Sequence, residues 1–276
     1  MPDNISNMNK PVAIITGANS GIGFAFAHAL HAQHYRLCLA DIQLDKIQAT
    51  LPASDQLMFY ALDVRDATGW KNMTDRVVEK FGTIDYLVNF AGIVQPGFIY
   101  NVPVSDIDRH IDINTKGTLY GTHVVGAQMK KQGHGHIINI ASLAGIAPVP
   151  GIALYSASKF AVRGFSLAAA HEYAPFGVTI SVVCPDLVKT PMYDLELQYR
   201  EETALVFSGS KKVLTPERVV AEILSVMKTK KREVTIPASR GLLARLAGAW
   251  PWLADVVRGR LVKKGLRRIE ELRRSR

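Results

Sequence analysis

Residues Val12-Ala-Ile-Ile-Thr16-Gly17-Ala-Asn-Ser-Gly21-Ile-Gly23 decide the fold of this chain. A short apolar strand runs into a glycine-rich turn, and the apolar residues 24–32 that follow have the length of a helix. Such a turn lets the backbone approach a pyrophosphate, and the first amide groups of the helix attract the anion. The spacing is GxxxGxG rather than the commoner GxGxxG. The segment therefore predicts the first βα unit of a nucleotide-binding fold.

The rest of the first 240 residues repeats this alternation of strand and helix. Several strand-like runs are continuously apolar, as expected when helices cover both faces of a parallel sheet. We expect an α/β, Rossmann-type doubly wound sheet of seven parallel strands within a catalytic domain at 1–240. Residues 185–212 follow a strand without clear periodicity, which is typical of a substrate lid. The predicted strands are 12–16, 35–41, 57–62, 84–89, 136–142, 178–184 and 233–236.

Composition restricts the class of protein. A chain of 276 residues with 48% apolar content can bury the core of one large α/β domain. The two cysteines, Cys38 and Cys184, lie in apolar runs and do not predict disulfides. The first residues have no basic or apolar segment typical of a signal peptide, so we expect a cytoplasmic location. His28, His31 and His34 have no acidic or sulfur partner nearby in sequence, and no metal site is expected.

The basic charge is concentrated in the tail, residues 241–276. From Arg240 onward there are eleven Arg or Lys and three acids, so nearly all of the net charge of +9 lies there. Apolar residues at helical spacing, including Trp250 and Trp252, alternate with these cations. The tail is therefore expected to be helical, either on an anionic membrane surface or packed on the protein itself. The nearly neutral body and the lack of stacking aromatics argue against nucleic acid.

Asp41 ends the second predicted strand, eighteen residues after Gly23. A carboxylate at this place accepts hydrogen bonds from ribose hydroxyls and repels a 2′-phosphate. No Arg or Lys occupies positions 18–22 or 42–44 to neutralise such a phosphate. NAD is therefore preferred over NADP.

Tyr155 and Lys159 are four residues apart, thirteen and seventeen residues after Ser142. In a helix they share one face, roughly 6 Å apart. A phenol ionises near pH ~10, and a neighbouring ammonium lowers that value. A change to about 7 corresponds to about 4 kcal/mol. The pair predicts a tyrosine that exchanges protons, although an ordinary surface pair is the simpler interpretation of the spacing alone.

Together these segments resemble the short-chain dehydrogenase/reductase family over about residues 10–240. The resemblance implies catalysis by Asn114, Ser142, Tyr155 and Lys159, with Tyr155 as general acid/base and Asn114 holding a water of a proton relay. It also implies dimers or tetramers formed through helices near 105–131 and 152–173. The cofactor-binding residues that it implies are Gly17, Asn19, Ser20, Gly21, Ile22, Gly23, Asp41, Asp63, Val64, Asn89, Ala91, Gly92, Tyr155, Lys159, Pro185, Val188 and Thr190.

Two positions depart from the family pattern. Phe90 replaces an asparagine and is expected to alter packing beside the cofactor. Asp186 replaces a glycine, and its carboxylate either favours the oxidised nicotinamide or shapes the loop.

The expected activity is hydride transfer between nicotinamide and a secondary alcohol or ketone, with a lipophilic substrate if the tail lies on a membrane. One alternative is a 3-oxoacyl-thioester reductase using NADPH, against which Asp41 argues. Another is a non-catalytic nucleotide-binding or membrane-associated scaffold, against which the complete set Ser142, Tyr155 and Lys159 argues.

Overall fold

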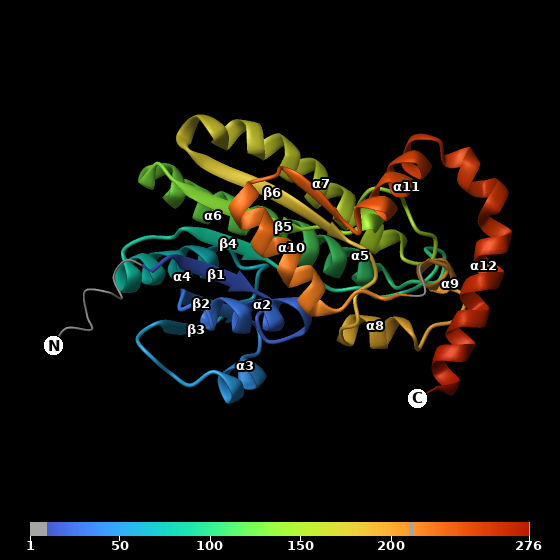
Figure 1. Ribbon diagram of the computed structural model, residues 1–276, viewed down its shortest axis with the longest axis horizontal. Helices are drawn as coiled ribbons and strands as arrows, with labels where there is room; N and C mark the ends of the chain where they lie inside the picture. Colours follow the sequence, from blue (N-terminus) through green and yellow to red (C-terminus); the bar gives the residue numbers. More distant parts are fainter. Residues whose placement is uncertain (1–9, 210–211, 276) are drawn as a thin grey trace.

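The computed structural model describes residues 10–209 and 212–275. Seven parallel strands form one sheet in the order β3-β2-β1-β4-β5-β6-β7 (Figure 1), which confirms the predicted fold class. The strands are β1 (Val12–Thr16), β2 (Arg36–Asp41), β3 (Leu57–Ala61), β4 (Tyr86–Asn89), β5 (Gly135–Ile140), β6 (Val178–Pro185) and β7 (Glu233–Ile236). Each predicted strand is present, and the differences are confined to the strand ends.

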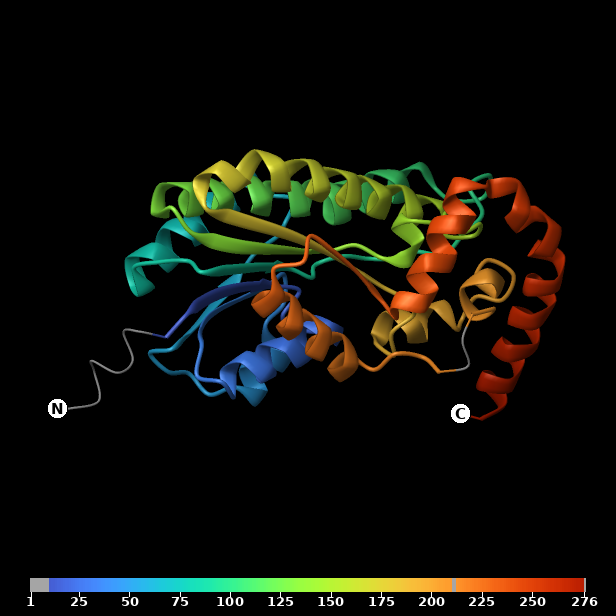
Figure 2. The same cartoon turned by 45° about the horizontal axis from the view of Figure 1, so that its top comes forward.

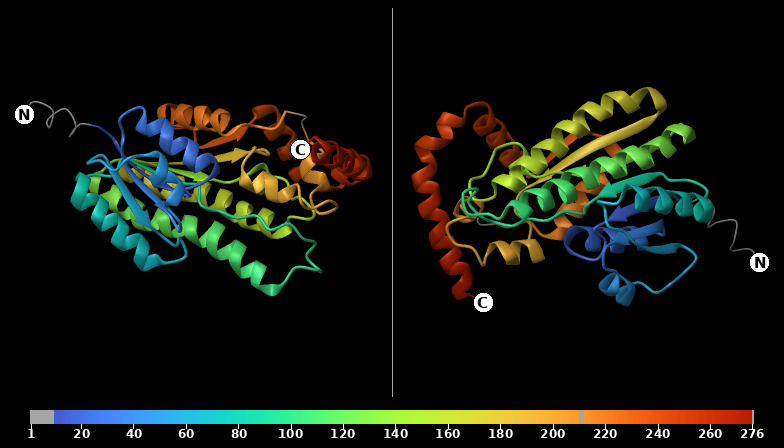
Figure 3. Two further views of the ribbon diagram at one scale, coloured as in Figure 1. Left: turned by 90° about the horizontal axis from the view of Figure 1, so that it is seen from below. Right: turned by 180° about the vertical axis from the view of Figure 1, so that it is seen from behind.

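Helices cover both faces of the sheet (Figures 2 and 3). The first face carries α2 (Gly21–His31), α3 (Asp45–Thr50) and α10 (Pro216–Thr229), and the second carries α4 (Ala67–Phe81), α6 (Gly117–Gln132) and α7 (Ala153–Tyr173). The short elements are α5 (Val104–His110), α8 (Pro191–Glu196), α9 (Ala204–Phe207), η1 (Ile111–Lys116), η2 (Leu143–Gly145) and η3 (Ala174–Phe176). The two faces bury separate apolar cores, one around Phe26 and the other around Trp70. This burial explains the continuously apolar strands.

The strand order reverses beside β1. The chain builds β1, β2 and β3 outward and then returns to place β4 on the other side of β1. Thr16 pairs with Ala40 on one side and Asn89 on the other, so the carboxyl ends of three strands meet. Ligands of doubly wound sheets bind in the crevice at such a reversal. The fold therefore brings the glycine turn, Asp41 and the end of β4 to one place.

The tail forms α11 (Ala238–Ala249) and α12 (Pro251–Arg274), which cross the end of the molecule beyond the carboxyl edge of the sheet (Figure 1). One face of α12 packs on the protein itself. Ile269 is fully buried with Tyr193 and Phe207, and a Cβ on Gly265 would lie 1.7 Å from the Ala204 carbonyl oxygen. The tail was expected either to lie on a membrane or to pack on the protein itself, and this face of α12 packs on the protein.

Some predictions concern residues outside the described ranges. The absence of a leader was predicted from residues 1–9, and the predicted lid includes residues 210 and 211. Among the helices of residues 10–209 and 212–275, none has both the length and the apolar character needed to span a bilayer.

Candidate active site

A cavity of about 1640 Å³ extends from the glycine turn, past the carboxyl ends of β1, β4 and β5, to α11 and α12. Most of the residues predicted to act on a cofactor or substrate contribute to its wall. They are Gly17, Ser20, Gly21, Ile22, Gly23, Asp41, Asp63, Val64, Ala91, Gly92, Ser142, Tyr155, Lys159, Pro185, Val188 and Thr190. The topology therefore collects side chains that span more than 170 residues of sequence.

The glycine turn leaves no room for side chains. A Cβ on Gly23 would lie 2.2 Å from the Gly17 carbonyl oxygen, and one on Gly17 would lie 2.8 Å from the Ala91 amide. Gly17 and Gly21 also have positive φ, at 68° and 56°. Ser20 precedes α2 in an extended conformation and its side chain makes no capping hydrogen bond. The first amides of α2 therefore remain available to an anion, and the turn fits a dinucleotide pyrophosphate.

Asp41 faces the cavity from the end of β2. One of its carboxylate oxygens accepts a hydrogen bond from the Asn19 backbone amide at 3.0 Å. The Asn19 side chain points the other way, because it donates to Asp45 and accepts from the Ile47 amide, each at 2.9 Å. Asn19 thus ties the glycine turn to α3 and orients Asp41, rather than lining the cavity itself.

Asp63, predicted to hold the adenine ring, is engaged by a neighbour that the sequence reasoning did not consider. The Arg65 guanidinium donates to both of its carboxylate oxygens at 2.6–3.0 Å. This pairing lowers the pKa of Asp63 and keeps it ionised. Arg65 also lines the cavity, so the adenine end carries a cation that is already paired.

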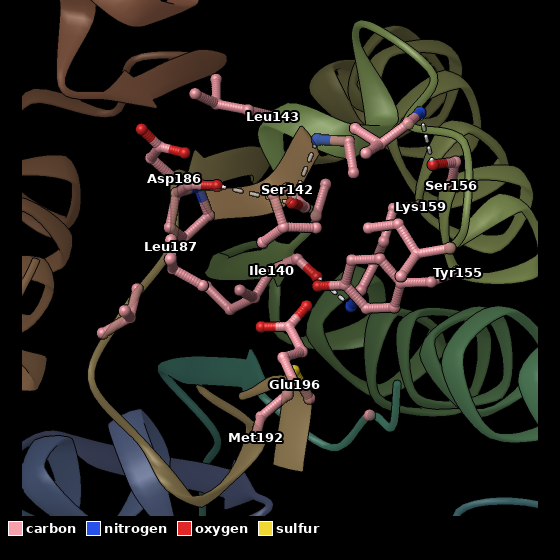
Figure 4. Close-up of a pocket in the computed structure, with 18 of the residues that line it drawn as sticks. Ile140, Ser142, Leu143, Tyr155, Ser156, Lys159, Asp186, Leu187, Met192 and Glu196 are labelled. Atoms are coloured by element: carbon pink, nitrogen blue, oxygen red, sulfur yellow. Dashed lines mark hydrogen bonds between the residues drawn. The ribbon is translucent and has the colours of Figure 1, made fainter. Parts of the chain in front are cut away.

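Ser142, Tyr155 and Lys159 converge in the middle of the cavity (Figure 4). Ser142 lies two residues beyond the end of β5, whereas Tyr155 and Lys159 lie on the first turns of α7. The Lys159 Nζ is 5.7 Å from the centre of the Tyr155 ring and donates to the Ile140 carbonyl oxygen at 2.9 Å. Its other two N–H donors have no acceptor among the described residues, so they are available to bind a ribose hydroxyl.

Burial is the main cause of the pKa shifts of Lys159 and Tyr155. It lowers the pKa of Lys159 to about 8, because a buried ammonium loses its hydration. It raises the pKa of Tyr155 well above its usual range; the nearby Glu196 adds to this rise and Ser142 opposes it. The expected lowering of the tyrosine pKa by Lys159 is therefore not seen in this structure. The phenol is a neutral proton donor here.

Asn114 and Asn89 lie behind the cavity wall. Asn114 is fully buried in η1, where its amide oxygen accepts from the Ile93 amide at 2.7 Å and its amide nitrogen donates to Ser158 at 2.9 Å. Asn89 donates to Asn139 at 2.9 Å and joins β4 to β5. Both side chains brace the strand ends, and the water predicted at Asn114 stays a prediction.

The two departures from the family pattern have clear structural roles. The Phe90 ring packs on Phe26 with ring centres 5.4 Å apart, as expected for a change in packing. Asp186 forms an ion pair of 2.8 Å with Arg240 of α11. Its charge is thus neutralised by Arg240, and the pair joins α11 to the loop after β6.

Sequence reasoning missed Glu196, the last residue of α8. Its side chain points into the cavity toward the Tyr155 hydroxyl (Figure 4), although only 5% of the residue is exposed. Burial raises its pKa to about 8. A signal did exist: Met192 and Glu196 are four residues apart and share the cavity-facing side of the helix.

The far end of the cavity is formed by the tail. Leu243 and Ala247 of α11 and Val257 and Leu261 of α12 line it together with Leu205 and Val206 of the predicted lid segment. Apolar side chains form most of this end, and Asp255, Arg258 and Lys264 of α12 also line it. Among the described residues, no group of three His, Cys, Asp or Glu side chains could hold a metal ion, and the expectation that no metal is used stays a prediction.

Comparison with known proteins identifies the fold and its chemistry. A family model described as short chain dehydrogenase matches residues 11–200. The chain belongs to the short-chain dehydrogenase/reductase family. The predicted class of enzyme, an NAD(P)-dependent oxidoreductase that interconverts alcohols and ketones, is confirmed at this level.

Several relatives are similar over most of their length. The 3-alpha-(or 20-beta)-hydroxysteroid dehydrogenase of Mycobacterium tuberculosis is 35% identical over 196 residues, covering 70% of this chain and 75% of the relative. The 3-oxoacyl-acyl-carrier-protein reductase FabG of Thermotoga maritima is 32% identical over 228 residues, covering 81% and 93%. The solved structure of ElxO with NADP bound has a TM-score of 0.74 at 28% identity, covering 82% and 96%.

Proposed function

We propose that this enzyme is an NAD-preferring dehydrogenase/reductase of lipophilic secondary alcohols and ketones. One observation carries the proposal. A single cavity joins a glycine turn that fits a pyrophosphate, the cluster of Ser142, Tyr155 and Lys159, and an apolar end formed by the lid and the tail. Residues 1–240 would provide catalysis, residues 185–212 the lid and residues 241–276 the cover of the apolar end.

The bound nicotinamide would supply or accept the hydride, and the protein would handle the proton. Tyr155, held neutral by burial, would donate its proton to the carbonyl oxygen during reduction and accept one during oxidation. The Ser142 hydroxyl would hydrogen-bond the same oxygen and stabilise its developing charge. Lys159 has two N–H donors available for the ribose of the cofactor.

NAD is preferred in this proposal because the Asp41 carboxylate faces the place expected for the adenosine ribose. Among the described residues, no cation forms a salt bridge with Asp41. Arg65, which also lines this end of the cavity, is paired with Asp63. ElxO binds NADP, and FabG is named as a 3-oxoacyl-acyl-carrier-protein reductase, so the NADPH-dependent 3-oxoacyl-thioester reductase is the second candidate. The measured preference between NAD and NADP separates the two.

The main test is a kinetic panel with full-length protein. Initial rates with NAD and NADP would be measured for 2-propanol, cyclohexanol, 2-decanol and a 3-hydroxysteroid, with acetoacetyl thioester reduction as the competing assay. We expect oxidation with NAD and rates that rise with apolar size. Tyr155→Phe should lower kcat by 10²–10⁴-fold and leave NADH binding within about twofold, because only the proton donor is removed. Retained turnover in this variant would remove Tyr155 from the mechanism.

Association with a membrane is a further part of the proposal. Leu242, Leu246, Trp250, Trp252 and Val256 are 43–76% exposed and form an apolar corner where α11 meets α12. The basic residues of α12 accompany them. Such a corner fits the interface of an anionic bilayer, so the enzyme would be cytoplasmic and peripheral at a membrane. Co-sedimentation with phosphatidylserine vesicles should fall when Trp250 and Trp252 are replaced by Ser; unchanged binding would contradict this.

Homodimers or homotetramers are proposed on the family resemblance. Val104 and Ile107 of α5 and Phe160 of α7 are exposed apolar residues on the elements expected to mediate contact. Light scattering of the wild type and of Phe160→Arg tests this, and a monomeric wild type would refute it.

A further inference from the structure

Glu196 is a carboxyl group on the cavity wall that has no hydrogen-bond or ion-pair partner among the described residues. Only 5% of the residue is exposed, and no hydrogen bond or ion pair reaches its side chain from residues 10–209 or 212–275. Met192, one helical turn earlier in α8, lines the wall beside it (Figure 4). A polar group buried in this way is costly unless something pairs with it. The cavity lies in front of this carboxyl group, so a ligand that enters the cavity can supply the partner.

The fold holds Glu196 in this position. The Thr203 hydroxyl donates to its backbone carbonyl at 3.0 Å and closes the loop after α8. Its neighbours Tyr193 and Leu197 are 5% and 3% exposed, and both pack in a cluster with Ile269 of α12. The helix therefore cannot turn the carboxyl group out to solvent without breaking this cluster.

The direction of the side chain selects the part of the ligand that it meets. Glu196 points toward the Tyr155 hydroxyl from the side opposite α7 (Figure 4). In the proposed reaction, the substrate oxygen lies at Tyr155 and Ser142. A ligand group that meets Glu196 then lies close to the reacting carbon. It must also form a hydrogen bond with a carboxyl group.

We propose that Glu196 determines specificity by binding a hydroxyl group on the carbon next to the reacting carbinol, so that the substrates are lipophilic vicinal diols and the corresponding hydroxyketones. This inference rests on the proposed dehydrogenase function. A carboxyl group and a hydroxyl can each donate and accept, which suits the protonated form favoured by burial. A site built to bind a substrate hydroxyl discriminates strongly against the analogue that lacks it, because the buried carboxyl is then left unpaired.

The test uses 1,2-decanediol and 2-decanol, which share the chain and the reacting carbon and differ in one hydroxyl. Oxidation rates with NAD would be measured for the full-length wild type, for Glu196→Met and for Glu196→Gln. Glu201→Gln is the matched control, since Glu201 is an exposed glutamate of the same lid segment. Thermal unfolding of each variant, at a pH where it is folded, accompanies the kinetics.

The wild type should prefer the diol in kcat/KM by at least about tenfold. Glu196→Met should lower kcat/KM for the diol by 10–100-fold and change that for 2-decanol less than threefold. The kcat/KM of Glu196→Gln for the diol should lie between the values of the wild type and Glu196→Met. The kcat/KM of Glu201→Gln should match the wild type. Equal losses on both substrates, or a wild type without preference for the diol, would overturn the inference while leaving the dehydrogenase function intact. Failure to reduce NAD or NADP with every alcohol of the panel would instead refute the proposed function.

Discussion

Replacing Glu196 by Gln should change how the stability of the enzyme depends on pH. Burial raises the pKa of Glu196 to about 8, from an ordinary value of 4.5. The folded protein therefore binds this proton more tightly than the unfolded chain does. The stabilisation linked to the proton is fully present below pH 4.5 and is lost as the pH rises toward 8. Gln has no ionisable proton, so residue 196 adds no pH dependence to the free energy of unfolding of the Glu196→Gln variant.

The size of the effect follows from the same values. One pH unit between the two pKa values corresponds to about 1.4 kcal/mol, so the interval from 4.5 to about 8 corresponds to about 5 kcal/mol. At pH 9 the wild type must hold a buried carboxylate that forms no ion pair with any residue of 10–209 or 212–275. The difference in the free energy of unfolding between Glu196→Gln and wild type should therefore rise by about 5 kcal/mol from pH 4 to pH 9.

Urea unfolding, followed by circular dichroism at pH 4, 5, 6, 7, 8 and 9, measures this difference. Comparing each variant with the wild type at every pH removes the contribution of the other ionisable groups. Glu201→Gln, at an exposed position of the same segment, should give a nearly constant difference. If the Glu196→Gln difference were also constant, Glu196 would ionise as it does in water, and its burial without a partner would be wrong.

Three further predictions concern the cofactor end and the tail. Gly23→Ala should abolish NADH binding, measured by fluorescence titration, because its Cβ would lie 2.2 Å from the Gly17 carbonyl oxygen; binding within tenfold of wild type would show that the turn can relax. Asp41→Ala should shift the ratio of kcat/KM for NAD to that for NADP toward NADP by 10-fold or more, since a carboxylate that repels a 2′-phosphate is removed; an unchanged ratio would disprove the NAD preference. Arg240→Gln should lower the free energy of unfolding by about 1–3 kcal/mol and raise the exchange of amide hydrogens in α11, because Asp186 loses its 2.8 Å partner; unchanged protection would mean that the pair does not hold the tail.

The parts of the fold that sequence reasoning predicted are those encoded locally. The strand 12–16, the glycine turn and the helix after it are adjacent in sequence, and each glycine is required by a contact or a positive φ. The i and i+4 relation of Tyr155 and Lys159 depends only on a helix, which is present as α7. Parallel order follows because strands joined by helices place their carboxyl ends at one edge.

The parts that were missed depend either on the exact path of a turn or on contacts between distant segments. Arg65 lies two residues from Asp63, but its approach to both carboxylate oxygens depends on how the chain turns after β3. The pairing of Asp186 with Arg240 requires α11 to pack beside β7 and η2. Neither partner can be identified from charge patterns alone, because a sequence with 33 basic and 24 acidic residues offers many equivalent pairs.

Glu196 shows why the substrate end of the site is the hardest to predict. The segment Tyr193-Asp-Leu-Glu196-Leu-Gln mixes apolar and acidic residues, and periodicity does not say which acid is buried. The structure decides it through Ile269, more than seventy residues away, which packs with Tyr193 and Leu197 and leaves Glu196 on the cavity side. Tyr193 and Val206 of the same cluster also line the cavity. The tail would then influence substrate choice without touching the reacting atoms. Substitution of Ile269 by Ala should therefore weaken the preference for 1,2-decanediol over 2-decanol. A preference that survives this change would show that the lid holds Glu196 by itself.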